Sequence, residues 1–203
     1  MSDLTLQHVV LRIVAALLIV AVHGFAVAGI SCLLGDPGPR HDGRLGLSPW
    51  RHADPIGGLL LVFFTLGWIR PIAVDPGQLR SGRVGLVAVV AGASGATLLL
   101  AILPRLMRPF VLNLLPDTAS ATFFIFVETL GQLCVSFTLF NLLPLPVLTG
   151  QHLLVALSPG WRDGLTRIRT YAAVVLALLV VSGMAARLLA PAQSLFMRLV
   201  LGD

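Results

Sequence analysis

Long apolar segments, separated by short stretches rich in glycine, proline or arginine, dominate the pattern of the chain. The longest of them cover residues 4–34, 84–103, 119–140 and 170–189. A helix needs about 20 apolar residues to cross the hydrocarbon core of a bilayer, so each of these segments is long enough. The apolar run 57–66 is shorter and predicts a short or re-entrant helix. The pattern predicts an all-α polytopic membrane protein: a bundle of about five transmembrane helices that forms one transmembrane domain, 1–203.

The composition agrees with this pattern and indicates the surroundings of the protein. Hydrophobic residues make up 57% of the 203 residues and charged residues only 11%, which is outside the range of ordinary soluble domains. All 14 basic residues are arginines, and the net charge of +5 suits loop arginines beside anionic lipid head groups. Nothing indicates a nucleic-acid partner. Arginine without lysine, together with abundant alanine, leucine, valine and glycine, suggests a GC-rich bacterial genome. We therefore expect an integral protein of the bacterial inner (cytoplasmic) membrane, with loop arginines spread too evenly for the positive-inside rule to fix its orientation.

One polar interruption stands between two apolar runs. Residues 141–150 read Asn-Leu-Leu-Pro-Leu-Pro-Val-Leu-Thr-Gly, and another apolar run follows at 152–157. Proline lacks an N–H group and clashes with the preceding turn, so Pro144 and Pro146 end a helix here. Inside a bilayer, broken backbone is tolerated only where protein buries it or where it lines a cavity. The segment is therefore either a simple inter-helix turn or an internal site in which Asn141, Pro144, Pro146 and Gly150 shape a groove.

The same segment resembles the Asn-x-x-Pro-x-Pro-x-Leu-Asp-Gly signature of the site-2 proteases, the intramembrane zinc metalloproteases of the M50 class. Residues 22–28, Val-His-Gly-Phe-Ala-Val-Ala, are similar to the zinc helix of that family, His-Glu-x-x-His. Residues 67–76 are similar to its Gly-Trp-x-(Lys/Arg)-Pro-Val-x-Val-x-Pro element. The resemblance covers about 11–159 in family order. It implies a site-2-protease-like core of the compact bacterial type without a PDZ domain, followed by an extra transmembrane helix at about 170–190.

The residues that would carry the family's chemistry are largely replaced. That chemistry needs two histidines one helical turn apart as zinc ligands, and a glutamate beside the first to take a proton from the zinc-bound water. The resemblance adds an aspartate of the later motif as third ligand. Here His23 remains, but Gly24 stands at the glutamate position, Val27 at the second histidine and Thr149 at the aspartate. These degenerate positions predict no catalytic residue and no cofactor, and hence a catalytically inactive pseudoprotease.

A second interpretation keeps an active enzyme. The residual candidates for a metal site are His23, His152 and His52, and zinc would be the cofactor only under this reading. An active intramembrane zinc metalloprotease with a non-standard metal site would still lack the general base. Otherwise His23 is a satisfied structural residue, and His52 holds loop backbone by a hydrogen bond.

Three further positions bear on partners. Glu128 lies within an apolar run, where an ionisable residue normally faces the bundle interior as a structural hydrogen bond or a functional contact. Gly92 and Gly95 belong to a run of small residues that permits close helix packing. We expect other integral membrane proteins as partners, bound through transmembrane helix packing, and the lipid bilayer. The protein would then be a scaffold, a regulator or an accessory subunit of a membrane protein complex.

Several local expectations complete the description. Trp68 with Arg70 suits an interfacial anchor, an amphipathic ring beside a snorkelling cation. Residues 43–47 allow a strand or hairpin at the membrane surface. Loops are expected at 104–117 and 158–169, and a short tail at 191–203.

Overall fold

The computed structural model describes residues 6–114 and 116–201, and in this part of the chain it contains ten helices and no β-strand. Five of its helical stretches are long and apolar enough to cross a membrane. They are α1 (Leu6–Leu33), α5 (Arg83–Leu106) with its continuation α6 (Arg108–Leu114), α7 (Asp117–Leu142), α9 (Trp161–Val181) and α10 (Met184–Leu201). The expectation of an all-α polytopic membrane protein is confirmed.

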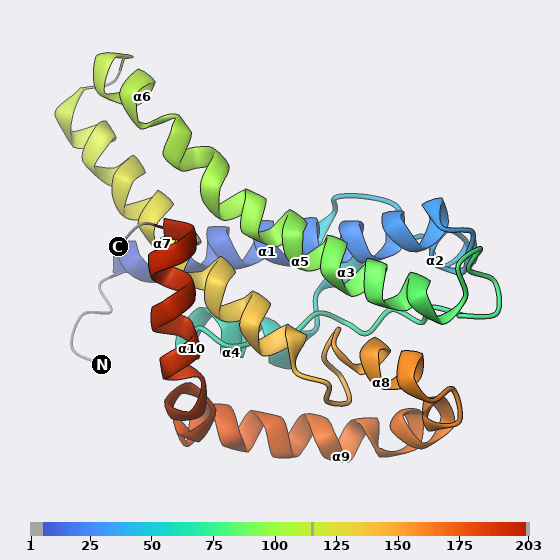
Figure 1. Ribbon diagram of the computed structural model, residues 1–203. Helices are drawn as coiled ribbons and strands as arrows, with labels where there is room; N and C mark the ends of the chain where they lie inside the picture. Colours follow the sequence, from blue (N-terminus) through green and yellow to red (C-terminus); the bar gives the residue numbers. More distant parts are fainter. Residues whose placement is uncertain (1–5, 115, 202–203) are drawn as a thin grey trace.

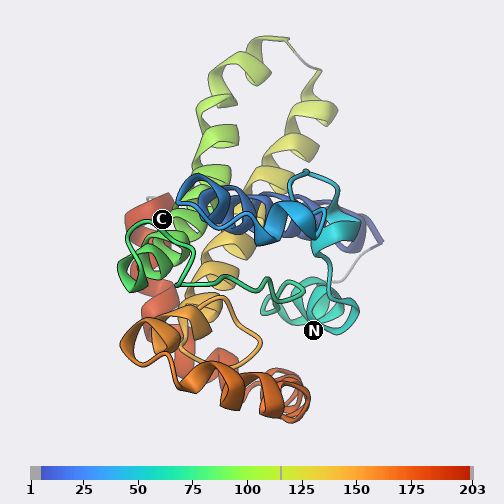
Figure 2. The ribbon, with the colours of Figure 1, turned by 90° about the vertical axis from the view of Figure 1, so that its right-hand side faces the viewer.

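Helices α1, α5 and α7 form the centre of the bundle, and each of them contacts the other two (Figure 1). The apolar windows of α1 and α7 are 56% and 61% buried, whereas those of α9 and α10 are 17% and 6% buried. Small residues such as Ala15, Ala16 and Ala93 are fully or almost fully buried where the central helices meet, which allows their backbones to approach closely. Figure 2 shows that the α5–α6–α7 hairpin extends well beyond the remaining helices.

Three short helices and an extended stretch connect α1 to α5. They are α2 (Gly38–His41), α3 (Pro49–His52) and α4 (Pro55–Phe64), followed by residues 65–82. Each of the three has a proline in its first turn, where the missing N–H group matters least. The Asp54 side chain caps α4 by accepting a hydrogen bond from the Gly57 N–H group (2.9 Å). The short helix expected at 57–66 is present as α4. The strand expected at 43–47 does not form, and within the described residues only an isolated antiparallel bridge joins Ala53 and Ile69.

Trp68 corrects another expectation, because it is only 1% exposed and is no interfacial anchor. Its indole packs in a cluster with Leu60, Phe140 and Leu176, so residues of α4, α7 and α9 surround it. A side chain at Gly57 would overlap the Trp68 carbonyl, and the absence of a Cβ atom there permits this close packing. The ring therefore contributes to the core instead of marking the membrane surface.

The C-terminal part also differs from the expected single span at 170–190. Helix α9 begins at Trp161, within the expected loop 158–169, because arginine has a high helix propensity and does not break the helix. It ends at Val181, before Gly183, whose φ of +74° is a conformation that glycine adopts readily. Helix α10 then covers residues 184–201, which include the end of the expected span and most of the tail expected at 191–203. Likewise, α5 continues through Pro104, and α6 fills most of the loop expected at 104–117.

Candidate functional site

His23 lies at the centre of the bundle, fully buried on α1. Its Nδ1 atom is 2.9 Å from the hydroxyl oxygen of Thr97 on α5. Its Nε2 atom is 2.9 Å from the hydroxyl oxygen of Thr149, which lies in the turn after α7. The imidazole edge also packs against the Phe137 ring, with 5.0 Å between the ring centroids. One side chain thus joins three segments that are far apart in the sequence.

The direction of these hydrogen bonds follows from Thr97. Its hydroxyl donates its only proton to the Ala93 carbonyl (2.9 Å), so towards His23 it accepts. The proton of a neutral imidazole therefore lies on Nδ1, and Nε2 accepts from the Thr149 hydroxyl. Every polar atom of the ring then has a partner. His23 is a satisfied residue inside the core, as the structural interpretation expects.

The donor set around His23 does not suit a zinc ion. Nitrogen and oxygen ligands about 2.0–2.2 Å from one tetrahedral zinc lie about 3.3 Å apart, with the metal between their lone pairs. Here the Nε2 atom of His23 and the hydroxyl oxygen of Thr149 are hydrogen-bonded to each other at 2.9 Å, with no space for a metal between them. Val27, at the position of the second histidine, is buried and offers no donor atom. In the described part of the chain, no group of three or more His, Cys, Asp or Glu side chains is placed to hold a metal.

The Gly24 position is covered by the ring of His52. A Cβ atom at Gly24 would overlap Cγ and Nδ1 of that imidazole, so α3 packs on α1 only because residue 24 has no side chain. His52 Nε2 donates to the Gly46 carbonyl (2.8 Å), and the His52 carbonyl accepts from the Arg70 N–H group (2.7 Å). A glutamate at position 24 would have no room. This contact explains a glycine inside a helix, which the sequence pattern left without a reason.

The electrostatic surroundings of His52 favour its neutral form. Burial is the main cause of a lowered pKa for this imidazole, and the nearby guanidinium groups of Arg44 and Arg51 lower it further. The hydrogen bond to the Gly46 carbonyl acts in the opposite direction and is weaker. With Nε2 as donor, Nδ1 is left as a buried acceptor without a partner among the described residues. Protonation of Nδ1 would place a charge between α3 and α1.

His152 lies elsewhere, on α8 (Gln151–Leu157), and is 6% exposed. Its ring forms a hydrogen bond with the backbone of Ile72, and burial, followed by the charges of Arg162 and Arg169, lowers its pKa. Together with Val27 and Thr149 it lines a cavity of about 10 Å³, which is room for at most about one water molecule. Of the three residual candidates, His23 and His52 are neighbours across Gly24. His152 does not join them in a metal-holding cluster.

The motif at 141–150 forms a buried turn. The Asn141 side-chain amide donates to the Gly67 carbonyl (2.8 Å) and the Phe137 carbonyl (2.9 Å), which fixes the end of α7 against the extended stretch 65–82. Gly150 donates its N–H to the Asn141 carbonyl (2.7 Å), and a side chain at Gly150 would overlap the backbone of the turn. Pro144 is exposed and Pro146 half-buried, and both follow the end of α7 at Leu142.

The turn also contains an unusual backbone conformation. Val147 has a φ of +80° and is buried. A β-branched residue rarely adopts this left-handed region, and strain of this kind persists only where the surrounding contacts hold it. The hydrogen bonds of Asn141 and Gly150 supply those contacts and place Thr149 opposite His23.

Glu128 stands apart from the His23 cluster. Its carboxylate pairs with Arg105 (3.0 Å) and with Arg108 (3.5 Å), and its side chain is 35% exposed. Arg105 also donates to the Leu201 carbonyl at the end of α10, so this cluster joins α5, α7 and α10. The expected interior contact is therefore an ion pair at the edge of the bundle.

The two glycines of the small-residue run have different surroundings. A Cβ atom at Gly92 would overlap the tip of the Ile30 side chain, so this position serves the packing of α5 on α1. A Cβ atom at Gly95 would meet nothing within 4 Å among the described residues. Gly95 alone leaves space beside α5 for another helix.

Comparison with known proteins identifies the family. No family model and no solved structure matches the chain. Among curated proteins, the chain is similar to "Putative zinc metalloprotease YwhC" of Bacillus subtilis (strain 168). The two are 32% identical over 177 residues, which cover 84% of this chain and 80% of that protein. This similarity, together with the five apolar helices, shows that the chain belongs to the M50-like family of membrane proteins.

Proposed function

We propose that the protein is a pseudoprotease: a site-2-protease-like membrane protein that hydrolyses nothing and acts by binding other integral membrane proteins. The observation that carries this proposal is the hydrogen-bonded chain Thr149–His23–Thr97, which occupies both ring nitrogens of His23, the histidine that remains of the zinc-helix motif. The packing of His52 on Gly24 supports it, because it fills the place of the general base. Neither feature offers a group that activates water.

The same contacts that oppose catalysis hold the bundle in one arrangement. His23 ties α1 to α5 and to the turn after α7, and Asn141 ties that turn to residues 65–82. A rigid core of this kind supports a binding role, since a partner helix meets a surface that is already ordered. We propose a scaffold, regulatory or accessory subunit of a complex in the bacterial inner membrane.

A partner helix would pack where the small-residue face of α5 is open. Close approach of helix backbones, with van der Waals contact and interhelical hydrogen bonds, drives association inside a bilayer. Gly95 has the space that such an approach requires, and Gly92 does not. A larger side chain at Gly95 should therefore disturb partner binding without disturbing the internal packing of the bundle.

Copurification from native membranes in mild detergent tests this proposal. Gly95→Leu should weaken recovery of a partner membrane protein while the melting temperature of the bundle stays within a few degrees of the parent. Gly95→Ala is the matched control and should retain the partner. Recovery of a partner-free protein that cleaves a membrane peptide, and that loses this activity in His23→Ala, would favour the metalloprotease with a non-standard metal site instead.

A further inference from the structure

Helix α10 differs from the other long helices in its direction. In Figures 1 and 2 it stands upright, whereas α1 and α9 lie crosswise. Figure 1 shows that α10 leads away from the end of α9, and its last residue, Leu201, accepts a hydrogen bond from Arg105 of α5, so it runs across the bundle at the end where α9 stops. Helices α1 and α9 are long enough to span a membrane, and where they cross it, this end lies at the membrane surface.

The side chains of α10 form three lanes along its length. The first lane is buried or half-buried on the bundle, where α10 contacts α5, α7 and α9; it comprises Ala185, Leu189, Ala192, Phe196 and Val200. The second lane is exposed and polar at three of its four positions, and consists of Arg187, Pro191, Ser194 and Arg198. The spacing of four, three and four residues keeps these on one helical face. The third lane is exposed and apolar, and contains Met184, Leu188, Leu195 and Leu199.

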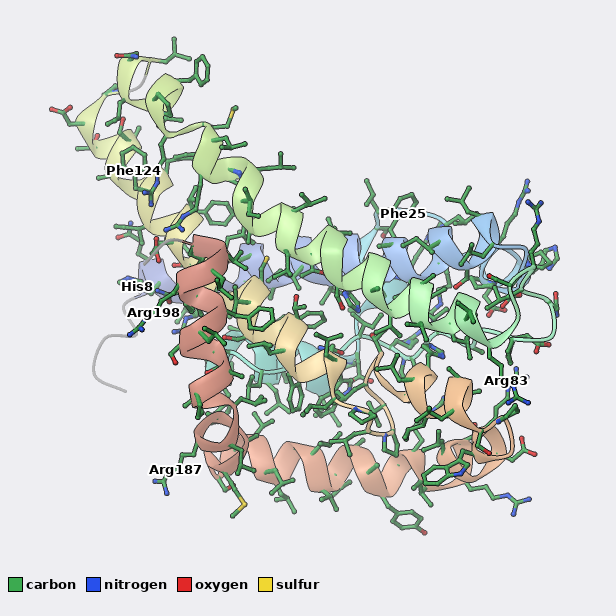
Figure 3. All side chains as sticks on the ribbon, in the orientation of Figure 1. His8, Phe25, Arg83, Phe124, Arg187 and Arg198 are labelled. Atoms are coloured by element: carbon green, nitrogen blue, oxygen red, sulfur yellow. The ribbon has the colours of Figure 1, made fainter. Side chains whose placement is uncertain are left out.

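The charge on the polar lane has one sign. Arg187 and Arg198 are about 16 Å apart along the helix axis, and no acidic residue occurs in the α10 sequence. Figure 3 shows both side chains extending away from the bundle, on its outer side. No partner for either guanidinium occurs among the ion pairs of the described residues. The lane is a basic strip open to whatever surrounds the protein.

This arrangement suits a helix that lies in the plane of the membrane surface. If α10 crossed the bilayer, its two exposed arginines, about 16 Å apart along the helix axis, would both lie within a hydrocarbon core about 30 Å thick, where a charge is costly. In the interfacial orientation the leucine lane enters the acyl region along its whole length, and the arginine lane stays at the depth of the head groups. Basic residues at that depth attract anionic lipids.

We propose that α10 is an interfacial helix that binds anionic phospholipid head groups through Arg187 and Arg198. The proposal does not depend on the pseudoprotease function, since an active enzyme would hold the helix in the same way. It leaves four long helices to cross the membrane.

Single cysteines at neighbouring positions test the orientation. Ser194→Cys and Leu195→Cys lie at the middle of α10 but on different lanes, and they would be made in a Cys32→Ala, Cys134→Ala background with an unchanged melting temperature. The full chain is placed in nanodiscs of phosphatidylcholine with a minority of phosphatidylglycerol and treated with a membrane-impermeant maleimide. We expect the cysteine at position 194 to react and the one at 195 to be protected. Protection of both, by hydrocarbon or by a bound protein, overturns the proposal, and so does reaction of both.

The lipid preference is tested on the same sample. A fluorophore at the cysteine of Ser194→Cys reports quenching by phosphatidylglycerol or phosphatidylcholine that carries a quencher. Each arginine near an anionic surface contributes about 1 kcal/mol, so the local preference for phosphatidylglycerol should fall roughly fivefold for each arginine replaced. Arg187→Gln/Arg198→Gln should therefore remove the preference, and Arg40→Gln/Arg83→Gln, at the other end of the bundle, should leave it unchanged. Equal quenching by both lipids in the parent protein, or equal loss in both double variants, contradicts the assignment.

Discussion

The central helices and the two C-terminal helices are all apolar enough to be candidate membrane spans, but they use their polar residues in opposite ways. Inside the α1–α5–α7 core, buried His23 and Thr97 are hydrogen-bonded to each other, and the buried Asn141 amide donates to the Gly67 carbonyl. On α10, Arg187, Ser194 and Arg198 point outwards. Hydropathy alone treats both regions as spans, whereas burial separates a polar core that fixes the fold from a polar lane that meets the surroundings.

The largest expected effect concerns the contact between Gly24 and His52. Gly24→Ala should lower the free energy of unfolding in detergent by about 1–3 kcal/mol, because the added methyl group overlaps the His52 ring. The matched control is Gly29→Ala, whose Cβ atom meets nothing within 4 Å, and which should be neutral or stabilising by up to about 1 kcal/mol. Thermal unfolding followed by circular dichroism measures both. If the two substitutions shift stability in the same direction, the close contact between His52 of α3 and Gly24 of α1 is contradicted.

Removal of one hydroxyl group from the core comes next. Thr149→Val leaves Nε2 of His23 without a donor in a buried place, which should cost about 1–3 kcal/mol. Thr138→Val is the control, since that hydroxyl is buried and has no partner among the described residues, so its loss should be neutral or stabilising. Denaturant or thermal unfolding of the two variants gives the comparison. A tolerated Thr149→Val would mean that the His23 chain is not formed in solution.

Much of the central fold could be predicted from the sequence, because a span leaves a local signal. The apolar runs of α1, α5 and α7 and the short helix α4 were all expected. The site could not be predicted in the same way. His23 forms hydrogen bonds with Thr97 and Thr149, which are 74 and 126 residues further along the sequence. Such contacts leave no periodicity in the chain. The Gly24–His52 packing is of the same kind, although an unexplained glycine in a helix was a usable hint.

The peripheral errors have a different cause. Arginines at 162–169 suggested a loop, yet charged residues are compatible with a helix that leaves the membrane. Trp68 suggested an interface because Arg70 lies close to it in the sequence, whereas its burial depends on Leu60, Phe140 and Leu176, which come from three helices. The partner of Glu128, Arg105, lay in a stretch expected to be a loop.

A smaller effect is expected from pH, through His52. Its pKa is lowered in the folded protein, so the unfolded chain binds the proton more readily. Stability should therefore be complete above the ordinary pKa of about 6.5 and decline as the pH falls from there towards the lowered value. His52→Asn should flatten this part of the pH profile of the melting temperature. An equally steep decline in His52→Asn would assign the titration to another group, such as His152.

The smallest effect belongs to the ion pair at the edge of the bundle. Glu128 is partly exposed, so Glu128→Gln should lower stability by at most about 1 kcal/mol. Glu128→Leu should be less tolerated, because the amide retains hydrogen bonds to Arg105 that leucine cannot make. Equal melting temperatures for the parent and both variants would show that the cluster contributes nothing to the bundle.

The metal content of the purified protein tests the central claim most directly. The full chain would be expressed with zinc in the medium, purified without chelator, and measured by inductively coupled plasma mass spectrometry beside His23→Ala and His152→Ala. Because Thr149 and Thr97 occupy both nitrogens of His23, the account predicts far less than one zinc per chain in all three proteins. One zinc per chain in the parent, lost in His23→Ala or His152→Ala, would contradict this account and support an active metalloprotease with a non-standard metal site.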